Sequence, residues 1–147
     1  MGRPLEHRVW VEDTPIPVGA HMKYLGLTLD GRWSFREHFS RLAPRLGRVV
    51  ASLSRLLPNL GGPDGRVRKI FAGTVQAVVL YGVPVFAGSM MADWRFRQII
   101  RQPQHRMAIR VARGNRTVSG VAAGILAALP PLELQAKAYA DMYAQER

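Results

Sequence analysis

Short runs of alternating apolar and polar residues occupy the first thirty positions, a pattern that predicts β-strands. Val9 and Val11 alternate with their neighbours between His7 and Glu12, and residues 22–29 are rich in β-forming side chains. We expect two or three short strands in this region. A sheet of that size cannot bury both of its faces by itself, so we expect it to pack against another part of the protein.

The next segment has the periodicity of an amphipathic helix. Ser34 followed by Glu37 is the spacing of a capping box, which predicts a helix start at this point. At about 100° per residue, a set of apolar residues falls within an arc of about 120°, and a set of arginines within about 80° on the other side. The apolar set is Phe39, Leu42, Leu46, Val49, Val50, Leu53, Leu56 and Leu57, and the arginine set is Arg41, Arg45, Arg48 and Arg55. Pro44 lies inside this segment, so we expect a kink or a later helix start near residue 43.

A second helix is predicted from Asp64, after the turn-forming residues 58–63, toward Tyr81. From Val75 to Ala92 the chain is apolar except for Gln76 and Ser89, which is about the length that spans a bilayer. Glycine and proline interrupt this run, and its flanks are basic on both sides. A central buried helix is therefore the better interpretation, and a membrane segment stays open as an alternative.

The remaining pattern predicts a third helix over residues 93–111, bent or split at Pro103 and stopped by Gly114 and Asn115. Either Thr117 or Ser119 is expected to cap a short helix that ends near residue 129. Pro131 then predicts a last helix over residues 132–147.

These elements define a mainly α (α+β) fold class. We expect a short N-terminal β-hairpin element over residues 1–31, followed over residues 32–147 by a bundle of about four or five helices.

Positive charge is concentrated in the middle of the chain. The 21 Lys and Arg residues exceed the 10 Asp and Glu residues, which gives a net charge of +11. Residues 31–75 hold nine basic and two acidic groups and residues 76–116 hold seven and one, whereas both ends are nearly neutral. Eighteen of the basic residues are arginine, whose forked donors suit phosphate oxygens. A GC-rich gene would explain arginine in place of lysine but not the clustering, so nucleic acid is the leading candidate ligand.

Few catalytic constellations are compatible with this sequence. The absence of Cys excludes disulfides, thiolate zinc sites and Cys nucleophiles. The four histidines have no i, i+4 pairing, and the Gly61–Gly62 pair favours a plain turn over a phosphate-binding loop. The first residues lack the apolar run of a signal peptide, so we expect an intracellular protein that is not secreted. We expect neither a catalytic residue nor a metal site in this chain.

Six short motifs follow one another along the sequence. They are Lys23-Tyr24-Leu25-Gly26 with Leu29-Asp30, Trp33-Ser34-Phe35 with His38, residues 53–63 (LSRLLPNLGGP), residues 80–86 (LYGVPVF), Arg116-Thr117-Val118-Ser119, and Leu129-Pro130-Pro131-Leu132. In this order and spacing they resemble the region immediately downstream of the catalytic palm in reverse transcriptases of LINE-type, non-LTR retrotransposons. The resemblance covers roughly residues 8–145.

The resemblance implies a parent RNA-directed DNA polymerase, a nucleotidyltransferase that uses Mg²⁺ held by palm aspartates upstream of this chain. It gives residues 23–26 a primer-grip-like role and makes residues from about 33 onward a helical thumb that grips the template-primer duplex. This chain has no Asp-Asp pair, so we expect it to hold no cofactor and to be inactive alone. Phe86 stands where the family commonly has Trp, and two prolines fall within segments that are usually helical, which suggests a decayed or partial copy.

The sequence therefore predicts a reverse transcriptase fragment that binds an RNA/DNA template-primer duplex and the missing palm and fingers, and no membrane. The predicted nucleic-acid-binding residues are Arg41, Arg45, Arg48, Arg55, Arg66, Arg68, Lys69, Arg106, Arg110, Arg113 and Arg116, and the primer-grip-like residues are Lys23, Tyr24, Leu25 and Gly26. Two alternatives stay open. One is a non-catalytic basic helical RNA-binding protein without polymerase ancestry, and the other is a small membrane protein.

Overall fold

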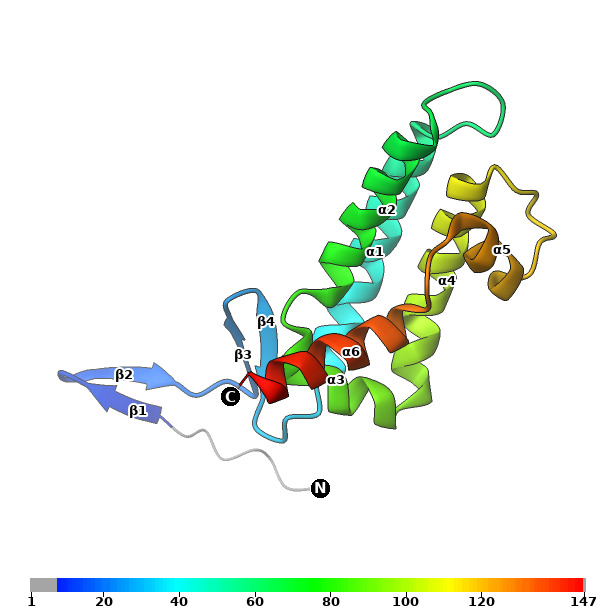
Figure 1. Cartoon of the computed structure of the whole chain (residues 1–147). Helices are drawn as coiled ribbons and strands as arrows, with labels where there is room; N and C mark the ends of the chain where they lie inside the picture. Colours follow the sequence, from blue (N-terminus) through cyan, green and yellow to red (C-terminus); the bar gives the residue numbers. More distant parts are fainter. Residues whose placement is uncertain (1–7, 147) are drawn as a thin grey trace.

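The computed structural model describes residues 8–146, which form two β-hairpins followed by six helices (Figure 1). The first hairpin pairs β1 (Arg8–Val11) with β2 (Thr14–Pro17), and the second pairs β3 (His21–Tyr24) with β4 (Leu27–Asp30), both antiparallel. The strand that the sequence did not predict is β2, which contains two prolines. The first strand was predicted from His7, which lies outside the described residues, and β1 is described from Arg8 onward.

The two hairpins differ in what they pack against. Every residue of β1 and β2 is exposed, and Figure 1 shows this hairpin projecting away from the helices. In β4, by contrast, Leu27 is buried, and a Cβ added at Gly82 would come within 2.9 Å of its side chain. The Tyr81 hydroxyl also donates a hydrogen bond to the carbonyl of Leu25 at 2.7 Å. The expectation that the β region packs against another part of the protein is therefore confirmed for the second hairpin only.

Helix α1 (Arg36–Arg55) begins without the predicted capping box. The Ser34 hydroxyl donates to Asp30 Oδ2 at 3.0 Å, and Glu37 forms an ion pair with an arginine one turn further along the helix. The Asp30 carboxylate accepts the backbone N–H of Ser34 and those of two neighbours, and these hydrogen bonds lower the pKa of Asp30. The sequence therefore predicted the helix start at the correct turn but assigned the wrong hydrogen-bond acceptor. The carboxylate of Asp30, at the end of β4, accepts these donors instead.

The late start predicted for the first helix and the split predicted at Pro103 are wrong, whereas a kink at Pro44 and a bend at Pro103 stay predictions. Helix α1 continues through Pro44, and α4 (Trp94–Ala112) continues through Pro103. Pro44 is exposed, so water can satisfy the carbonyl that it leaves without a donor. Pro103 is buried, and the packing of α4 against each of the other five helices compensates for the lost hydrogen bond.

Helix α2 (Gly65–Leu80) begins as predicted, because the Asp64 side chain accepts the N–H of Val67 at 3.0 Å. The single buried helix predicted over residues 75–92 is instead broken, and α3 (Val83–Ala92) follows at 83° to α2. The chain turns at Gly82, which has a φ of 71°. Within residues 8–146 no single helix is long and apolar enough to cross a membrane, although the bent α2–α3 pair is by length and composition.

Three predicted helix boundaries agree closely with the last elements. Asp93 caps α4, whose last turn ends in a left-handed Arg113, one residue before the predicted stop. Ser119, and not Thr117, caps α5 (Gly120–Ala127), because its hydroxyl oxygen accepts the N–H of Ala122 at 3.2 Å. Helix α6 (Leu132–Gln145) follows Pro131 as predicted, and the last predicted helical residue, Arg147, lies outside the described residues.

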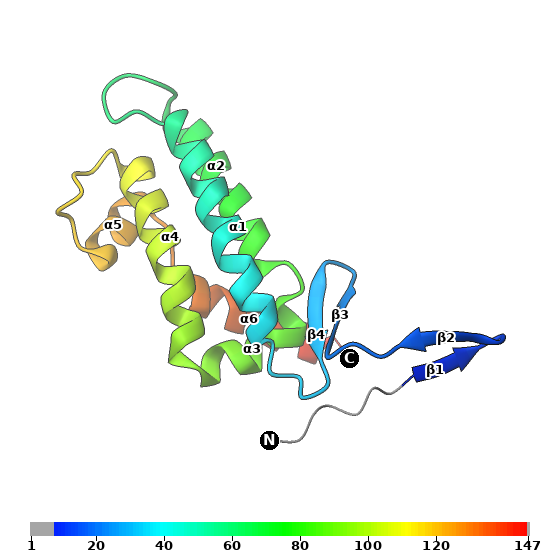
Figure 2. The same ribbon diagram turned by 180° about the vertical axis from the view of Figure 1, so that it is seen from behind.

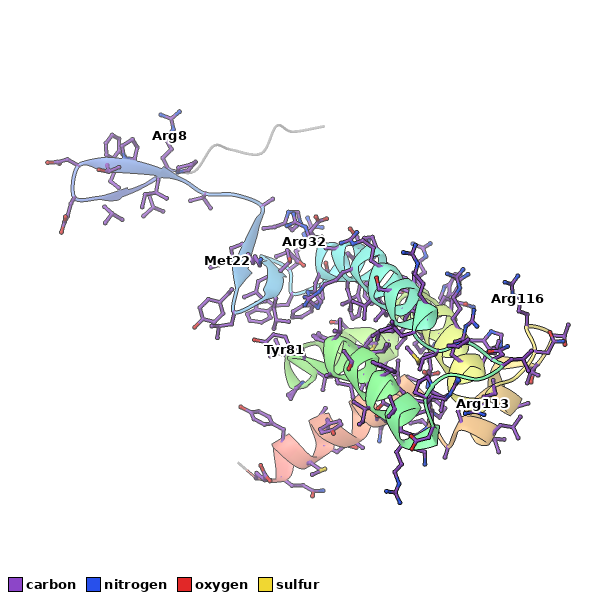
Figure 3. All side chains as sticks on the ribbon, turned by 90° about the horizontal axis from the view of Figure 1, so that it is seen from above. Arg8, Met22, Arg32, Tyr81, Arg113 and Arg116 are labelled. Carbon is purple, nitrogen blue, oxygen red and sulfur yellow. The ribbon has the colours of Figure 1, made fainter. Side chains whose placement is uncertain are left out.

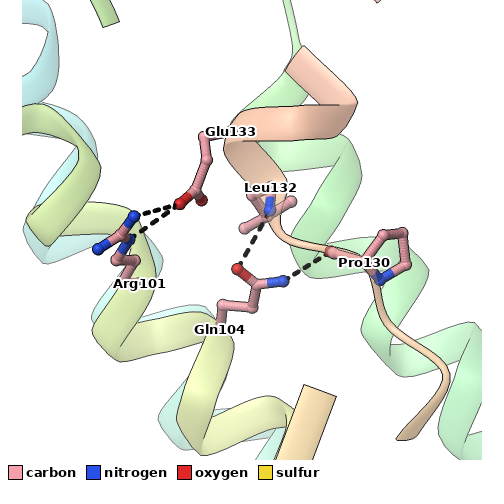
Figure 4. Close-up of polar contacts among 5 residues, drawn as sticks. All are labelled: Arg101, Gln104, Pro130, Leu132 and Glu133. Carbon is pink, nitrogen blue, oxygen red and sulfur yellow. Dashed lines mark hydrogen bonds and ion pairs between the residues drawn. The ribbon is translucent and has the colours of Figure 1, made fainter. Parts of the chain in front are cut away.

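Polar contacts fix the start of α6 against α4 (Figure 4). Gln104 accepts the N–H of Leu132 at 3.2 Å and donates to the carbonyl of Pro130 at 2.8 Å. Arg101 donates from Nε and Nη2 to one oxygen of Glu133, at 2.9 Å and 2.7 Å. These contacts explain why a loop that carries two prolines holds α6 in one position.

The helices enclose a hydrophobic core that also includes Leu27 from β4. Helices α1 and α4 run side by side in the same direction, with α2 behind α1 in the view of Figure 2. The mainly α (α+β) class is confirmed, but the described chain has six helices in place of four or five, because the apolar run breaks at Gly82. The division into residues 1–31 and 32–147 stays a prediction.

Candidate nucleic-acid interface

The exposed side of α1 carries the first group of arginines. Phe39, Leu42, Leu46 and Val50 are buried on the inner side of the helix, which directs the arginines outward. Arg41, Arg45, Arg48 and Arg55 are all exposed. Arg41 forms an ion pair with Glu37 at 2.7 Å, whereas the other three arginines have no ion-pair partner within residues 8–146. These three guanidinium groups are available to an anion.

A second line of arginines runs along α4. Arg95 and Arg106 are eleven residues apart, which places them on one side of the helix. Arg113 follows the last helical residue in a left-handed conformation, and all three arginines are exposed. Arg106 borders a groove between α1 and α4, so this line faces the neighbouring helix. Arg95 was not among the predicted residues, because the sequence does not reveal that α1 and α4 lie side by side.

The groove between the two helices is small and mostly uncharged. It has a volume of about 190 Å³ and is lined on the α1 side by Ala43, Gly47 and Val50. Gln102 and Arg106 contribute its polar groups from α4. Of the residues that line the groove, only Arg106 is charged, and the arginines of α1 project from another side of that helix. Figure 3 shows nitrogen-bearing side chains on α1 and toward the end of α4.

Further arginines surround the loop that joins α1 to α2. Arg110 donates to the side-chain oxygen of Asn59 at 3.3 Å, and Arg113 donates to the carbonyl of Pro63 at 3.1 Å. The Asn59 amide in turn donates to the carbonyl of Gly114 at 3.0 Å. Arg116 is exposed in the loop that follows α4 (Figure 3). These residues extend the basic surface to one end of the helix bundle.

Arg68 is the clear exception among the predicted interface residues. It has a relative exposure of 0%, and its guanidinium donates to the carbonyls of Pro58, Gly61, Pro63 and Arg110. Burial lowers the pKa of Arg68, and the neighbouring Arg113 and Arg110 lower it further. With its donors occupied inside the protein, Arg68 cannot contact a phosphate, so its assignment to the interface is wrong.

Two other predicted residues lie on a different side of the molecule. Arg66 and Lys69 are exposed on α2, at angles of about 160° and 100° from the buried Arg68. Because α2 lies behind α1 in Figure 2, its outer side does not face the same way as the arginines of α1 and α4. The structure therefore separates Arg66 and Lys69 from the rest of the predicted set.

Acidic side chains in the helical body are few and locally engaged. Residues 36–113 contain fourteen basic residues but only Glu37, Asp64 and Asp93 as acids. Glu37 pairs with Arg41, and the two aspartates accept backbone N–H groups at the starts of α2 and α4. Most of the positive charge on this surface is therefore not neutralised from within the chain, which favours an external polyanion.

The predicted primer-grip-like residues form the turn of the second hairpin. Lys23 and Tyr24 end β3, and Leu25 and Gly26 form the turn with φ values of 45° and 85°. All four residues are exposed. The Tyr81 hydroxyl holds the carbonyl of Leu25, so the turn is anchored to the junction of α2 and α3.

Within residues 8–146 no group of three His, Asp or Glu side chains is placed to hold a metal ion. His38 is buried beside Phe39 and Phe86, and burial lowers its pKa. His105 is hydrogen-bonded to the carbonyl of Val118 at 2.8 Å. Both side chains therefore have packing or hydrogen-bonding roles that require no ligand.

A second groove differs chemically from the arginine surface. It is a groove of about 550 Å³ between α4, α5 and the start of α6, and most of its lining is small or apolar. Its charged residues, Arg101 and Glu133, pair with each other. Val121 and Ile125 of α5 are exposed beside it, and α5 has no charged residue. This groove lacks the unpaired cations that a phosphate backbone requires and is not part of the candidate interface.

Comparison with known proteins points to mobile genetic elements. The chain is 32% identical over 136 residues to a 115 kDa protein of the type-1 retrotransposable element R1DM of Drosophila melanogaster. The match includes 90% of this chain, but the chain spans 13% of the relative's length. No family model and no solved structure matches the chain. The similarity supports a retrotransposon origin of this sequence.

Proposed function

We propose that this chain is the thumb, with the adjoining end of the palm, of a non-LTR retrotransposon reverse transcriptase. In this role it holds the RNA/DNA template-primer duplex against the exposed sides of α1 and α4. The observation that carries the proposal is the set of exposed arginines on these two parallel helices, led by Arg45, Arg48 and Arg106, which have no ion-pair partner among residues 8–146. The similarity to the R1DM protein and the order of the six sequence motifs support the family assignment.

The proposal assigns binding to this chain and nucleotide addition to the rest of the parent protein. The chain corresponds to 13% of the R1DM protein's length and contains no Asp-Asp pair. Palm aspartates elsewhere in the parent would hold the Mg²⁺ ions that activate the primer and the incoming nucleotide. The arginines of α1 and α4 would fix the position of the duplex backbone without reading its sequence. The turn at residues 23–26 would lie beside the primer strand, and the parent would act in the cytoplasm and nucleus.

Replacing Arg41, Arg45 and Arg48 together with alanine tests this assignment. Each phosphate contact releases counterions from the nucleic acid when it forms. For each contact that the variant loses, the slope of log affinity against log salt concentration should therefore become shallower by about 0.9. We expect weaker binding to an RNA/DNA hybrid at low salt and a shallower salt dependence, measured by fluorescence anisotropy over a salt titration.

The control is the double variant Arg66→Ala and Lys69→Ala on the outer side of α2, which removes two positive charges in place of three. It removes positive charge from the other side of the bundle, so any effect on affinity reflects only the long-range electrostatic field of the protein. Equal losses of hybrid affinity in the two variants would contradict a specific binding surface on α1 and α4. An unchanged affinity in the triple variant would mean that the α1 arginines are only a solvated helix surface.

The alternative of an RNA-binding protein without polymerase ancestry predicts a different ligand preference. A thumb grips a duplex, so the hybrid should compete better than single-stranded RNA of equal length. Preference for single strands would favour the alternative. The membrane alternative depends on the apolar run in α2 and α3, but Val75, Val79, Val83 and Phe86 already lie in the hydrophobic core. Core packing therefore accounts for that run.

A further inference from the structure

Gly47 lies in the middle of α1, where no contact within the protein requires a glycine. Glycine in a helix interior is unfavourable relative to alanine, because its backbone loses more conformational entropy on folding. A Cβ added at Gly47 would meet no atom within 4 Å, and the backbone there has no positive φ. Neither close packing nor backbone strain within the chain explains this residue.

The space above Gly47 belongs to the groove between α1 and α4. Gln102 and Arg106 line the other side of this groove, and Arg106 is exposed with no ion-pair partner among the described residues. Arg48 follows Gly47 in sequence but lies about 100° further around α1, outside the residues that line the groove. The open space therefore has an uncharged floor with one cationic side chain, Arg106, on its α4 side.

We propose that Gly47 is the point at which a sugar-phosphate backbone comes closest to α1. The strand would lie over the groove, with Arg106 neutralising a phosphate from the α4 side and the Gln102 amide able to donate a hydrogen bond to a phosphate oxygen. A side chain at position 47 would fill the groove and hold the strand away from both residues. This inference rests on the proposed function and adds to it the place of closest approach.

The chain supplies a matched control for this idea. Gly73 also lies in a helix interior, in α2, and a Cβ added there would likewise meet nothing within 4 Å. Gly73 is about 140° around α2 from the buried Arg68, on the outer side of that helix. The same substitution at the two glycines therefore has the same local effect on helix stability but a different position relative to α1 and α4.

The test compares Gly47→Leu and Gly73→Leu in thermal unfolding and in binding to an RNA/DNA hybrid at low salt. Both variants should fold, with a folding equilibrium constant raised by about two- to fivefold, because leucine is the better helix former. Gly47→Leu should weaken hybrid binding by about tenfold, and Gly73→Leu should change it by less than about twofold. Gly47→Ala, which adds a single methyl group, should give an intermediate loss.

The outcomes separate the inference from the proposed function. If the wild-type chain binds the hybrid and Gly47→Leu binds it equally well, the strand does not bind at the groove, and only this inference is overturned. If both leucine variants lose affinity equally, the effect is not local to the groove, and the inference is again overturned. If the wild-type chain does not bind the hybrid at all, the proposed function fails and the inference fails with it.

Discussion

Arg68 is a buried cation that joins the α1–α2 loop to the end of α4. Its guanidinium donates to backbone carbonyls of three loop residues and to that of Arg110, which lies 42 positions further along the chain. Gly61 and Gly62 have positive φ values and supply the left-handed turns that direct the loop toward Arg68. These turns do not themselves connect the loop to α4, and Arg68 provides that connection. The planar fork of arginine suits several carbonyls at once, a geometry that lysine cannot reproduce.

Replacing Arg68 with methionine should destabilise the protein by roughly 3 kcal/mol, because four backbone carbonyls in a part-buried site lose their charged donor and gain none. Urea denaturation followed by circular dichroism measures the change. Arg66→Met, on the exposed part of the same helix turn, is the control and should shift stability by no more than about 0.5 kcal/mol. Equal unfolding midpoints for the two variants would contradict a structural role for Arg68.

At the scale of elements, His38 connects the second hairpin to α1. Its Nδ1 accepts the backbone N–H of Thr28 at 3.4 Å, and its ring packs against Phe39 and Phe86. This contact requires neutral imidazole, because a protonated ring has no acceptor nitrogen. Burial lowers the pKa of His38 from its ordinary value of 6.5, which keeps the ring neutral in the folded protein.

The stability of the protein should therefore fall as the pH drops below about 6.5. In that range the unfolded chain binds a proton at His38 that the folded protein does not bind, until the pH reaches the lowered pKa of the folded state. His38→Asn offers an acceptor that does not titrate, so its stability should depend less on pH between 7 and 5. Chemical denaturation of both proteins at several pH values measures the difference. Parallel pH profiles would exclude His38 as the source.

At the scale of the whole molecule, charge and apolar surface are separated. The unpaired arginines follow α1 and α4, whereas the uncharged α5 exposes Val121 and Ile125 beside the larger groove. The first hairpin also exposes Trp10 and Ile16 and makes no contribution to the core. Under the proposed function, the palm of the parent polymerase would cover this hairpin.

Removing residues 1–19 should therefore leave the helical body intact. The hydrophobic core begins with Leu27, so we expect the thermal midpoint to change by less than a few degrees. The shortened chain should also aggregate less, because an exposed strand pair with apolar side chains is removed. Thermal unfolding and size-exclusion chromatography measure both effects. Loss of cooperative unfolding in the shortened chain would show that the first hairpin supports the core.

The sequence alone determined the helical segments, most of their caps and the clustering of positive charge. These features depend on neighbours within one or two turns, so periodicity and local hydrogen-bonding residues such as Asp64 and Ser119 suffice to predict them. The same local reasoning failed at Ser34, because the carboxylate of Asp30 at the end of β4 accepts the Ser34 hydroxyl and the N–H of Phe35. It also failed at Gly82, where the apolar run turns by 83°.

Only the tertiary structure decided which basic residues share a surface. Helical periodicity places a residue on a side of its own helix but does not say which helices are neighbours. The parallel packing of α1 and α4 brings Arg106 to a groove that it shares with Gly47 of α1, whereas Arg66 belongs to α2, which lies behind α1 in Figure 2. Packing likewise turned Arg68 from a predicted phosphate ligand into an internal cross-link, because burial and four carbonyl partners depend on segments far apart in the chain.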